Sequence, residues 1–177
     1  MSGRLARAVG VLRRVVGRAR ASAALVSTTR SARRPRTTKP RGGYPGDFEG
    51  MPTVAYTPVA GNRPDPGEVV WAWVPFEEDA TRGKDRPVLL IGRDRSWLLG
   101  LPLTSLDHDR DAAQEARAGR YWMDIGTGPW DSRGRASEAR VNRIVRLDPD
   151  AVRRTSAALP RDVFDRVIAE VRVHRGH

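Results

Sequence analysis

The stretch that decides the fold runs from residue 67 to residue 105, and it opens with GEVVWAWVPF over residues 67–76. A charged loop separates this run from RPVLLI over residues 86–91, and a short turn then leads into WLLGLPLTS over residues 97–105. The first run alternates its side chains as a half-buried strand does, whereas Val88–Ile91 is continuously apolar, as in a central strand. This order predicts three consecutive antiparallel strands.

The chain beyond residue 105 carries weaker strand signals and one clear helix. Residues 106–119 are polar and predict a loop with a helical turn, and residues 120–124 and 139–147 predict further strands around a Gly-rich loop. Pro160 can open a helix, because its missing N–H would lack a partner there in any case. One face of that helix carries the apolar residues Val163, Phe164, Val167, Ile168 and Val171. The expected fold is mainly β, a small barrel of about five short antiparallel strands closed by a C-terminal helix.

The net charge of +11 is concentrated at the N-terminal end. Residues 1–43 contain 11 Arg, one Lys and no acid, so they contribute +12, and the other 134 residues are nearly neutral at −1. The charge therefore indicates a basic arm and not a basic folded surface. The absence of cysteine excludes a disulfide framework, a thiolate zinc site and a cysteine nucleophile. Because no export signal is visible either, we expect a cytoplasmic protein.

Three zones are expected along the chain. Residues 1–27 combine apolar residues at helical spacing with many arginines, which predicts either a basic amphipathic helix for an anionic surface or a largely disordered, solvated extension. Residues 28–65 are rich in Pro, Gly, Thr and Arg and are typical of a linker. Residues 66–175 have the pattern of a folded domain. The residues expected to pin the linker to this domain are aromatic: Tyr44, Phe48 and Tyr56.

Arg86 and the pair Thr104 and Ser105 form a candidate phosphate site, because they lie at the start of one predicted strand and at the end of the next. A guanidinium is planar, charged and able to bind two phosphate oxygens at once, and hydroxyl groups can add hydrogen bonds. The structural alternatives are an ion pair of Arg86 with Asp85 or Glu77, and a strand-end turn in which the hydroxyls bond to the backbone.

Other candidate motifs are weaker. The acidic segment 107–111 surrounds His108 but lacks the spacing of metal ligands, so we expect a solvated loop and no metal site. Gly126 and Gly128 lack the third glycine of a phosphate fingerprint and predict a turn. Tryptophans can stack on bases, but those in predicted strands are expected in the core. Trp130, in the Gly-rich loop, is the one expected to be exposed.

These residues resemble the PemK/MazF toxins of bacterial type II toxin–antitoxin systems. The similarity rests on residues 67–71, 83–90 and 101–105, which look like the first three strands of that family. Residues 137–145 are similar to its fourth block, and residues 164–171 fit its C-terminal helix. The resemblance covers roughly the last 110 residues and leaves the arm and linker outside it.

The resemblance implies an SH3-like barrel that acts as a homodimer and needs no cofactor. It implies metal-independent cleavage of single-stranded RNA through attack by the 2′-hydroxyl, as in an mRNA interferase, and neutralisation by a cognate antitoxin that occupies the RNA groove. The residues expected to carry the chemistry are Arg86, Thr104 and Ser105, and those expected to contact RNA are Arg140, Asn142, Lys84 and Trp130.

One departure from the family pattern concerns the fourth block. Some members carry an Arg and an Asp two positions apart, and here the match gives Arg140 and Asn142. An amide cannot take up a proton at neutral pH, so a carboxylate base is missing at that position. The alternative function is a non-catalytic relative that binds nucleic acid, RNA or DNA, through phosphate contacts of the Arg-rich arm, with a steep salt dependence. A third hypothesis places that arm on an anionic membrane surface.

Overall fold

The computed structural model describes residues 37–40, 42–59, 61, 63–105 and 112–176. All of them belong to one compact unit, Arg34–His177. The predictions for the arm at residues 1–27 and for the acidic segment 107–111 therefore lie outside the described residues.

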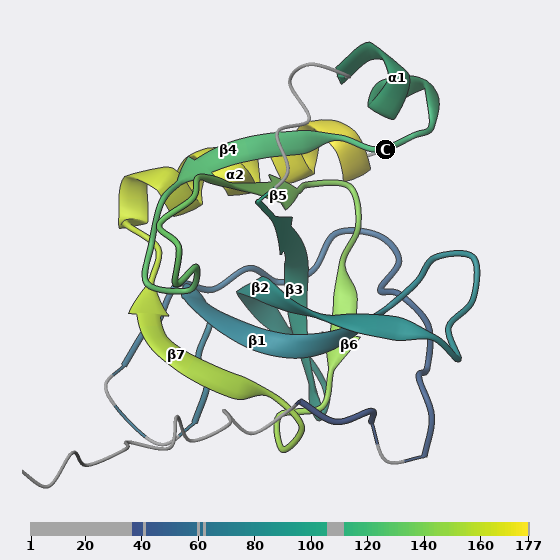
Figure 1. Cartoon of the computed structure of the whole chain (residues 1–177), viewed down its shortest axis with the longest axis vertical. Coiled ribbons are helices and arrows are strands. Elements are labelled where there is room, and N and C mark those ends of the chain that lie inside the picture. Colours follow the sequence, from purple (N-terminus) through teal and green to yellow (C-terminus); the bar gives the residue numbers. More distant parts are fainter. Residues whose placement is uncertain (1–36, 41, 60, 62, 106–111, 177) are drawn as a thin grey trace, which may run out of the picture. The chain divides into compact units, whose positions relative to one another are not determined.

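The described chain is a curled antiparallel sheet with a C-terminal helix (Figure 1), which confirms the mainly β expectation. The sheet order is β4-β5-β3-β2-β1-β7, and β6 also pairs with β3. The elements follow one another as β1 (Glu68–Pro75), β2 (Gly83–Asp94), β3 (Trp97–Thr104), α1 (Ala112–Arg117), β4 (Trp122–Gly126), β5 (Ser137–Arg140), β6 (Val145–Leu147), β7 (Arg153–Ala158) and α2 (Arg161–Arg175).

The strand count differs from the expected five in two places. The predicted strand over residues 139–147 is two short strands, because the chain turns at Val141 and Asn142 between β5 and β6. The polar strand β7 was not predicted at all, and it pairs with β1 at the edge of the sheet. Five of the sheet's pairings involve β1, β2 or β3, so the predicted three-strand core does organise the fold.

Strands β1, β2 and β3 are buried on both faces. One face lies in a core cluster shared with α2, which includes Val69, Leu89 and Phe164. The other face lies in a second cluster with β6, which includes Val70 and Val88. Burial of adjacent residues on both faces explains why Val88–Ile91 has no polar alternation, as expected for a central strand.

The hairpin of β2 and β3 contains one extra residue. The strands pair from Asp94 opposite Trp97, but the register shifts between Leu90 and Gly92, so that Ile91 forms a bulge. Gly92 is required here, because a Cβ atom would lie 2.5 Å from the carbonyl oxygen of Thr53. The segment around Thr53 therefore packs directly on the bulge.

Part of the segment expected as a linker packs on the domain. Phe48, Val54 and Tyr56 contact the core cluster. The Phe48 N–H donates to the Ile144 carbonyl at 2.8 Å, and the Tyr56 hydroxyl donates to the Leu159 carbonyl at 2.8 Å. These contacts fix residues 48–56 on the barrel, while the boundaries of the three zones stay a prediction.

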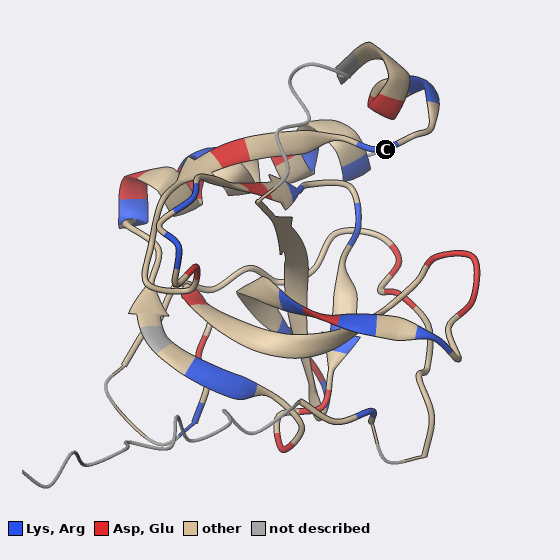
Figure 2. Ribbon diagram, in the orientation of Figure 1, with Lys and Arg blue, Asp and Glu red and all other residues tan. Residues whose placement is uncertain are grey.

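Helix α2 buries the face that the sequence predicts. Phe164, Val167, Ile168 and Val171 are buried, and Val163 packs against the same cluster. No helix in the described part of the chain combines the length and the apolar character that crossing a membrane requires. Lysines, arginines and acids are interspersed over the described elements in Figure 2, in keeping with the near-neutral body.

Candidate functional site

Two pockets lie side by side where β2 begins and β3 ends. The first has a volume of about 370 Å³, and we call it the glutamate pocket because Glu77 and Glu115 border it. The second has a volume of about 350 Å³, and we call it the loop pocket because the Gly-rich loop borders it. Arg86 and Thr104 are the two residues that line both pockets, so they form the wall between them.

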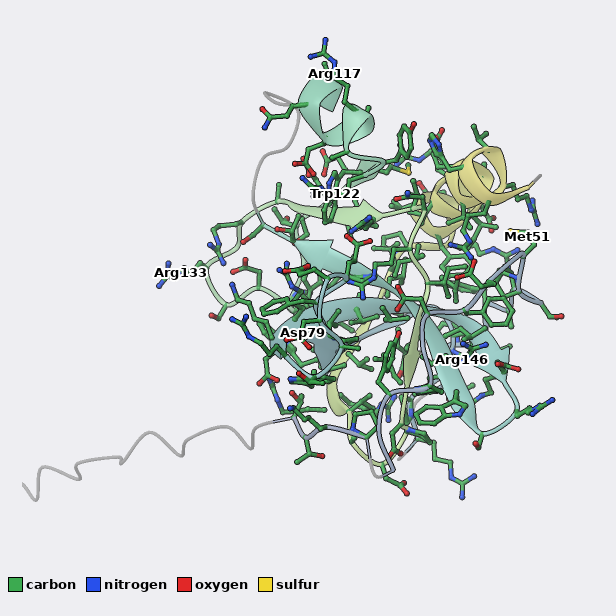
Figure 3. The ribbon with its side chains drawn as sticks, turned by 90° about the vertical axis from the view of Figure 1, so that its right-hand side faces the viewer. Met51, Asp79, Arg117, Trp122, Arg133 and Arg146 are labelled. Atoms are coloured by element: carbon green, nitrogen blue, oxygen red, sulfur yellow. The ribbon has the colours of Figure 1, made fainter. Side chains whose placement is uncertain are left out.

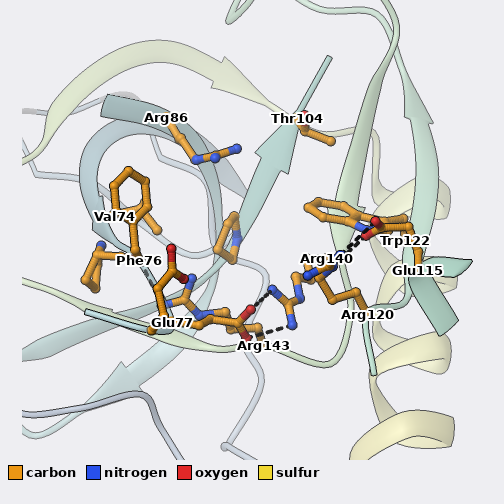
Figure 4. Close-up of a pocket in the computed structure, with 13 residues that line it drawn as sticks. Val74, Phe76, Glu77, Arg86, Thr104, Glu115, Arg120, Trp122, Arg140 and Arg143 are labelled. Atoms are coloured by element: carbon orange, nitrogen blue, oxygen red, sulfur yellow. Dashed lines mark hydrogen bonds and ion pairs between the residues drawn. The ribbon is translucent and has the colours of Figure 1, made fainter. Parts of the chain in front are cut away.

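The strand register explains why Arg86 and Thr104 meet. Val88 pairs with Pro102 in the ladder of β2 and β3. Continuing this register by two residues sets Arg86 opposite Thr104, and residues directly opposite each other point to the same side of a sheet. The structure thus brings together the guanidinium and the hydroxyl that the sequence singled out (Figure 4).

Arg86 is half-buried, and its guanidinium has no hydrogen bond or ion pair with any residue that the structure describes. Burial lowers the pKa of the Arg86 guanidinium from its ordinary value, and the positive charges of Arg143 and Arg140 lower it further. A cation held in this way gains from any anion that enters the pocket. The ion pair of Arg86 with Asp85 or Glu77, which was the structural alternative, is not formed, and Glu77 pairs with Arg140 instead.

The two neighbouring arginines have carboxylate partners, unlike Arg86. Arg140 donates from Nη1 and Nη2 to the two carboxylate oxygens of Glu77, both at 2.7 Å (Figure 4). Arg143 donates from Nε to Asp47 at 2.7 Å and from Nη2 to the Pro75 carbonyl at 2.9 Å. The pocket holds four guanidinium groups, those of Arg86, Arg120, Arg140 and Arg143, and Arg86 alone lacks a counter-charge among the described residues.

The far wall of the glutamate pocket is built around Glu115 in α1. Its carboxylate accepts hydrogen bonds from Arg120 Nε at 2.7 Å, from Arg120 Nη2 at 2.9 Å and from Trp122 Nε1 at 3.0 Å. The hydrogen bond to Glu115 raises the pKa of Arg120. Arg140 also lies over the Trp122 ring at 5.9 Å, so this wall is a connected set of side chains.

Lys84 and Ser105 line the loop pocket, on the other side of Arg86. Lys84 is exposed and Ser105 is half-buried, so both can meet a ligand from solvent. Arg133 adds a further exposed cation, and it projects outward from the Gly-rich loop (Figure 3). Thr104 itself is 6 % exposed, so its hydroxyl is reached from within the pockets.

The expectation of an exposed Trp130 is wrong. Its ring is 3 % exposed, its Nε1 donates to the Ser137 hydroxyl at 3.0 Å, and its carbonyl accepts from Trp71 Nε1 at 3.1 Å. Gly128 lies against the ring, where a Cβ atom would come within 2.2 Å of it. Trp130 therefore anchors the Gly-rich loop, whereas Trp71 and Trp122, expected in the core, are half-buried.

The Asn142 side chain also has a structural role, and it borders neither pocket. Its side chain donates to the Gly119 carbonyl at 2.6 Å and accepts from the Tyr121 N–H at 3.2 Å. It thus ties the turn after β5 to the start of β4. Arg140, two residues earlier, does line the glutamate pocket.

Sequence reasoning missed five charged residues of the glutamate pocket: Glu77, Glu78, Glu115, Arg120 and Arg143. Arg143 lies three residues after Arg140 in the same sequence block, and this second arginine could have been predicted as a site residue. The other four lie in α1 or in the loops before β2 and β4, and no local pattern distinguishes them from solvated charges. Within the described ranges no group of three or more His, Cys, Asp and Glu side chains could hold a metal ion.

Comparison with known proteins adds a family and two solved structures. The profile described as "PemK-like, MazF-like toxin of type II toxin-antitoxin system" matches residues 65–174. MazF from Deinococcus radiodurans is 19 % identical, with a TM-score of 0.45, over 66 % of this chain and 100 % of that one. A MazE–MazF structure from the same organism is 17 % identical, with a TM-score of 0.45, over 66 % of this chain and 98 % of that one. The curated proteins give no match.

Proposed function

The chain belongs to the PemK-like, MazF-like toxin family of type II toxin–antitoxin systems, and on that premise we propose that it is an endoribonuclease that cleaves single-stranded RNA without a metal ion. The observation that carries this proposal is Arg86, a half-buried guanidinium without a counter-charge among the described residues, on the wall between two pockets. Such a site is suited to a phosphodiester whose two flanking nucleotides occupy the two pockets.

The proposed reaction uses the 2′-hydroxyl of the substrate as nucleophile on the adjacent phosphorus. Negative charge then develops on the non-bridging phosphate oxygens, and Arg86 is placed to stabilise it. Thr104 and Ser105 donate hydrogen bonds to the phosphate, which fixes its orientation for attack. The lowered pKa of Arg86 also makes this guanidinium a better proton donor than an ordinary arginine.

The remaining predicted contacts differ in what supports them. Lys84 is exposed in the loop pocket and is proposed to meet a neighbouring phosphate. Arg140 is proposed to act on the opposite side, in the glutamate pocket. Trp130 and Asn142 are proposed to hold the walls of the site, because their polar groups are engaged with the protein.

The partners proposed for this protein follow from the family alone. We propose that it pairs with a second copy, that a cognate antitoxin blocks the RNA site, and that it acts in the cytoplasm. Analytical ultracentrifugation of the full chain tests the dimer. Co-expression with the product of a neighbouring reading frame, scored by rescue of growth and co-purification, tests the antitoxin.

The decisive experiment compares RNA cleavage by the wild type, Arg86→Ala and Arg93→Ala in the presence of EDTA. Arg93 is a matched control, since it is an exposed arginine later on the same strand that pairs with Asp65 and borders neither pocket. We expect Arg86→Ala to lose about 10²- to 10³-fold in rate, as when a principal charge-stabilising donor is removed, and Arg93→Ala to keep it. The products should end in a 2′,3′-cyclic phosphate, and a 2′-deoxynucleotide at the cleavage site should block the reaction.

Two results would count against this function. Equal activity of the wild type and Arg86→Ala would remove the role of the guanidinium. RNA binding without cleavage, with a steep salt dependence that disappears on deletion of residues 1–43, would favour the non-catalytic relative instead.

A further inference from the structure

On the basis of the proposed endoribonuclease function, we propose that the Glu77 carboxylate accepts the proton of the attacking 2′-hydroxyl, and that Arg140 holds it in place. In this step the 2′-oxygen bonds to phosphorus while the bond from phosphorus to the 5′-oxygen breaks. The products are a 2′,3′-cyclic phosphate and a 5′-hydroxyl. The proton of the 2′-hydroxyl passes to Glu77, and the leaving 5′-oxygen takes a proton from water held at Arg86. The hydroxide that remains takes the proton back from Glu77, so that both the water and the carboxylate are restored.

The geometry of Glu77 fits a proton acceptor. It lies two residues after the end of β1 and borders the glutamate pocket together with Arg86 and Thr104. Arg140 grips both carboxylate oxygens at 2.7 Å. The Arg140 side chain is only 9 % exposed, whereas that of Glu77 is 44 % exposed. The buried partner therefore fixes the carboxylate at the open side of the pocket, where each oxygen keeps a lone pair for a substrate hydroxyl.

The other acids near the pocket are less suited to this role. The oxygens of Glu115 already accept three hydrogen bonds from Arg120 and Trp122. Glu138 pairs with Thr104 across β3 and β5, but it is 8 % exposed and borders neither pocket. Glu78 is exposed and has no partner among the described residues that would orient it.

The charges that face Glu77 come from several elements. Arg86 on β2, Arg140 on β5, Arg143 after β5 and Arg120 before β4 are cationic, and Glu78 and Glu115 are anionic. The pocket around Glu77 is thus net cationic.

The test measures single-turnover RNA cleavage by the full chain over a range of pH, for the wild type, Glu77→Gln and Glu78→Gln. Glu78→Gln removes the same charge from the same loop without touching an ion pair. We expect Glu77→Gln to lose about 10²-fold in the maximal single-turnover rate constant with little change in the half-saturating protein concentration, and to lose the acidic limb of the pH profile. Glu78→Gln should stay within about twofold and keep that limb. Added acetate should restore at least about a tenth of the lost activity to Glu77→Ala, since a free carboxylate can replace the missing base.

Thermal unfolding of each variant verifies the fold, and the acetate experiment with Glu77→Ala decides the question if Glu77→Gln does not fold. The proposal is overturned if Glu77→Gln keeps the wild-type rate and pH profile, or if it becomes faster, as expected when a carboxylate merely competes with RNA for Arg140. It is also overturned if the acidic limb disappears in Glu138→Gln instead. An inactive wild type would overturn the proposed function as well, whereas an active one with a normal Glu77→Gln would remove only Glu77.

Discussion

Replacing Arg86 with methionine should make the fold more stable and at the same time abolish RNA cleavage. Arg86 is half-buried, lacks an acceptor among the described residues and is repelled by Arg140 and Arg143. Folding therefore brings its charge into a less favourable environment than the unfolded chain provides. Methionine has a similar length and can fill the same space without that cost.

The size of the effect follows from the half-burial. Exchanging buried charged groups for apolar ones of similar volume is neutral or stabilises by about 1–4 kcal/mol. Because Arg86 keeps part of its hydration, we expect Arg86→Met to raise the free energy of unfolding by about 1 kcal/mol, the lower end of this range. For a domain of this size, that corresponds to a rise in Tm of about 3–4 °C.

Arg143→Met is the matched control, because it removes an arginine from the same pocket that does have partners. It deletes the hydrogen bonds to Asp47 at 2.7 Å and to the Pro75 carbonyl at 2.9 Å. Hydrogen bonds to a charged group contribute about 1.5–3 kcal/mol, so we expect a loss of about 2 kcal/mol and a lower Tm.

Urea and thermal unfolding of the three proteins, with and without inorganic phosphate, measure these differences. Phosphate at about tenfold above its Kd should stabilise the wild type by about 1.4 kcal/mol and should leave Arg86→Met unchanged. The reasoning is refuted if Arg86→Met is destabilised as much as Arg143→Met, or if phosphate protects both variants as it protects the wild type.

Two further predictions concern stability away from the pocket wall. Burial, and then the hydrogen bond to Asp47, raise the pKa of Tyr44 above its ordinary value of 10.0, so the folded state retains the phenol proton longer than the unfolded state. The free energy of unfolding should therefore fall as the pH rises above that ordinary value. Tyr44→Phe should reduce this slope, which reaches at most about 1.4 kcal/mol per pH unit, as measured by urea unfolding at several pH values. Gly128→Ala should cost about 1–3 kcal/mol because its methyl group would enter the Trp130 ring, whereas Gly61→Ala, with 4.0 Å of space, should be neutral; urea midpoints showing equal stability would contradict this.

The parts of the fold that were predictable are those encoded by neighbouring residues. The apolar runs of β1, β2 and β3 and the amphipathic face of α2 follow from periodicity, and the short turn between β2 and β3 brings Arg86 near the Thr104–Ser105 pair. Strand β7 could not be found in this way, because its sequence RRTSAA has neither an apolar run nor a regular alternation. It becomes a strand through its pairing with β1.

The parts of the site that escaped prediction depend on contacts between distant residues. Glu77 and Arg140 are 63 positions apart, and Arg143 and Asp47 are 96 positions apart. The burial of Trp130 has the same origin, since a Gly-rich loop predicts exposure and only the contacts with Ser137 and Trp71 reverse it. The local sequence shows which charged residues are present, but only the folded sheet determines which of them lie next to each other.

The bulge at Ile91 determines which hydroxyl-bearing residue of β3 and its end lies opposite Arg86. The first pair after the turn is Asp94 with Trp97. If this register continued without a bulge, Arg86 would lie opposite Ser105. The additional residue moves the alignment by one and presents Thr104 instead. Val54 forms a β-bridge with Gly92, and Gly92 packs against Thr53, so both contacts hold the bulge in place. The segment before β1 therefore helps to determine which hydroxyl lies opposite Arg86. If Ile91 were instead paired regularly within the ladder, Ser105 would face Arg86 in place of Thr104, whereas deleting Ile91 would leave Thr104 opposite Arg86.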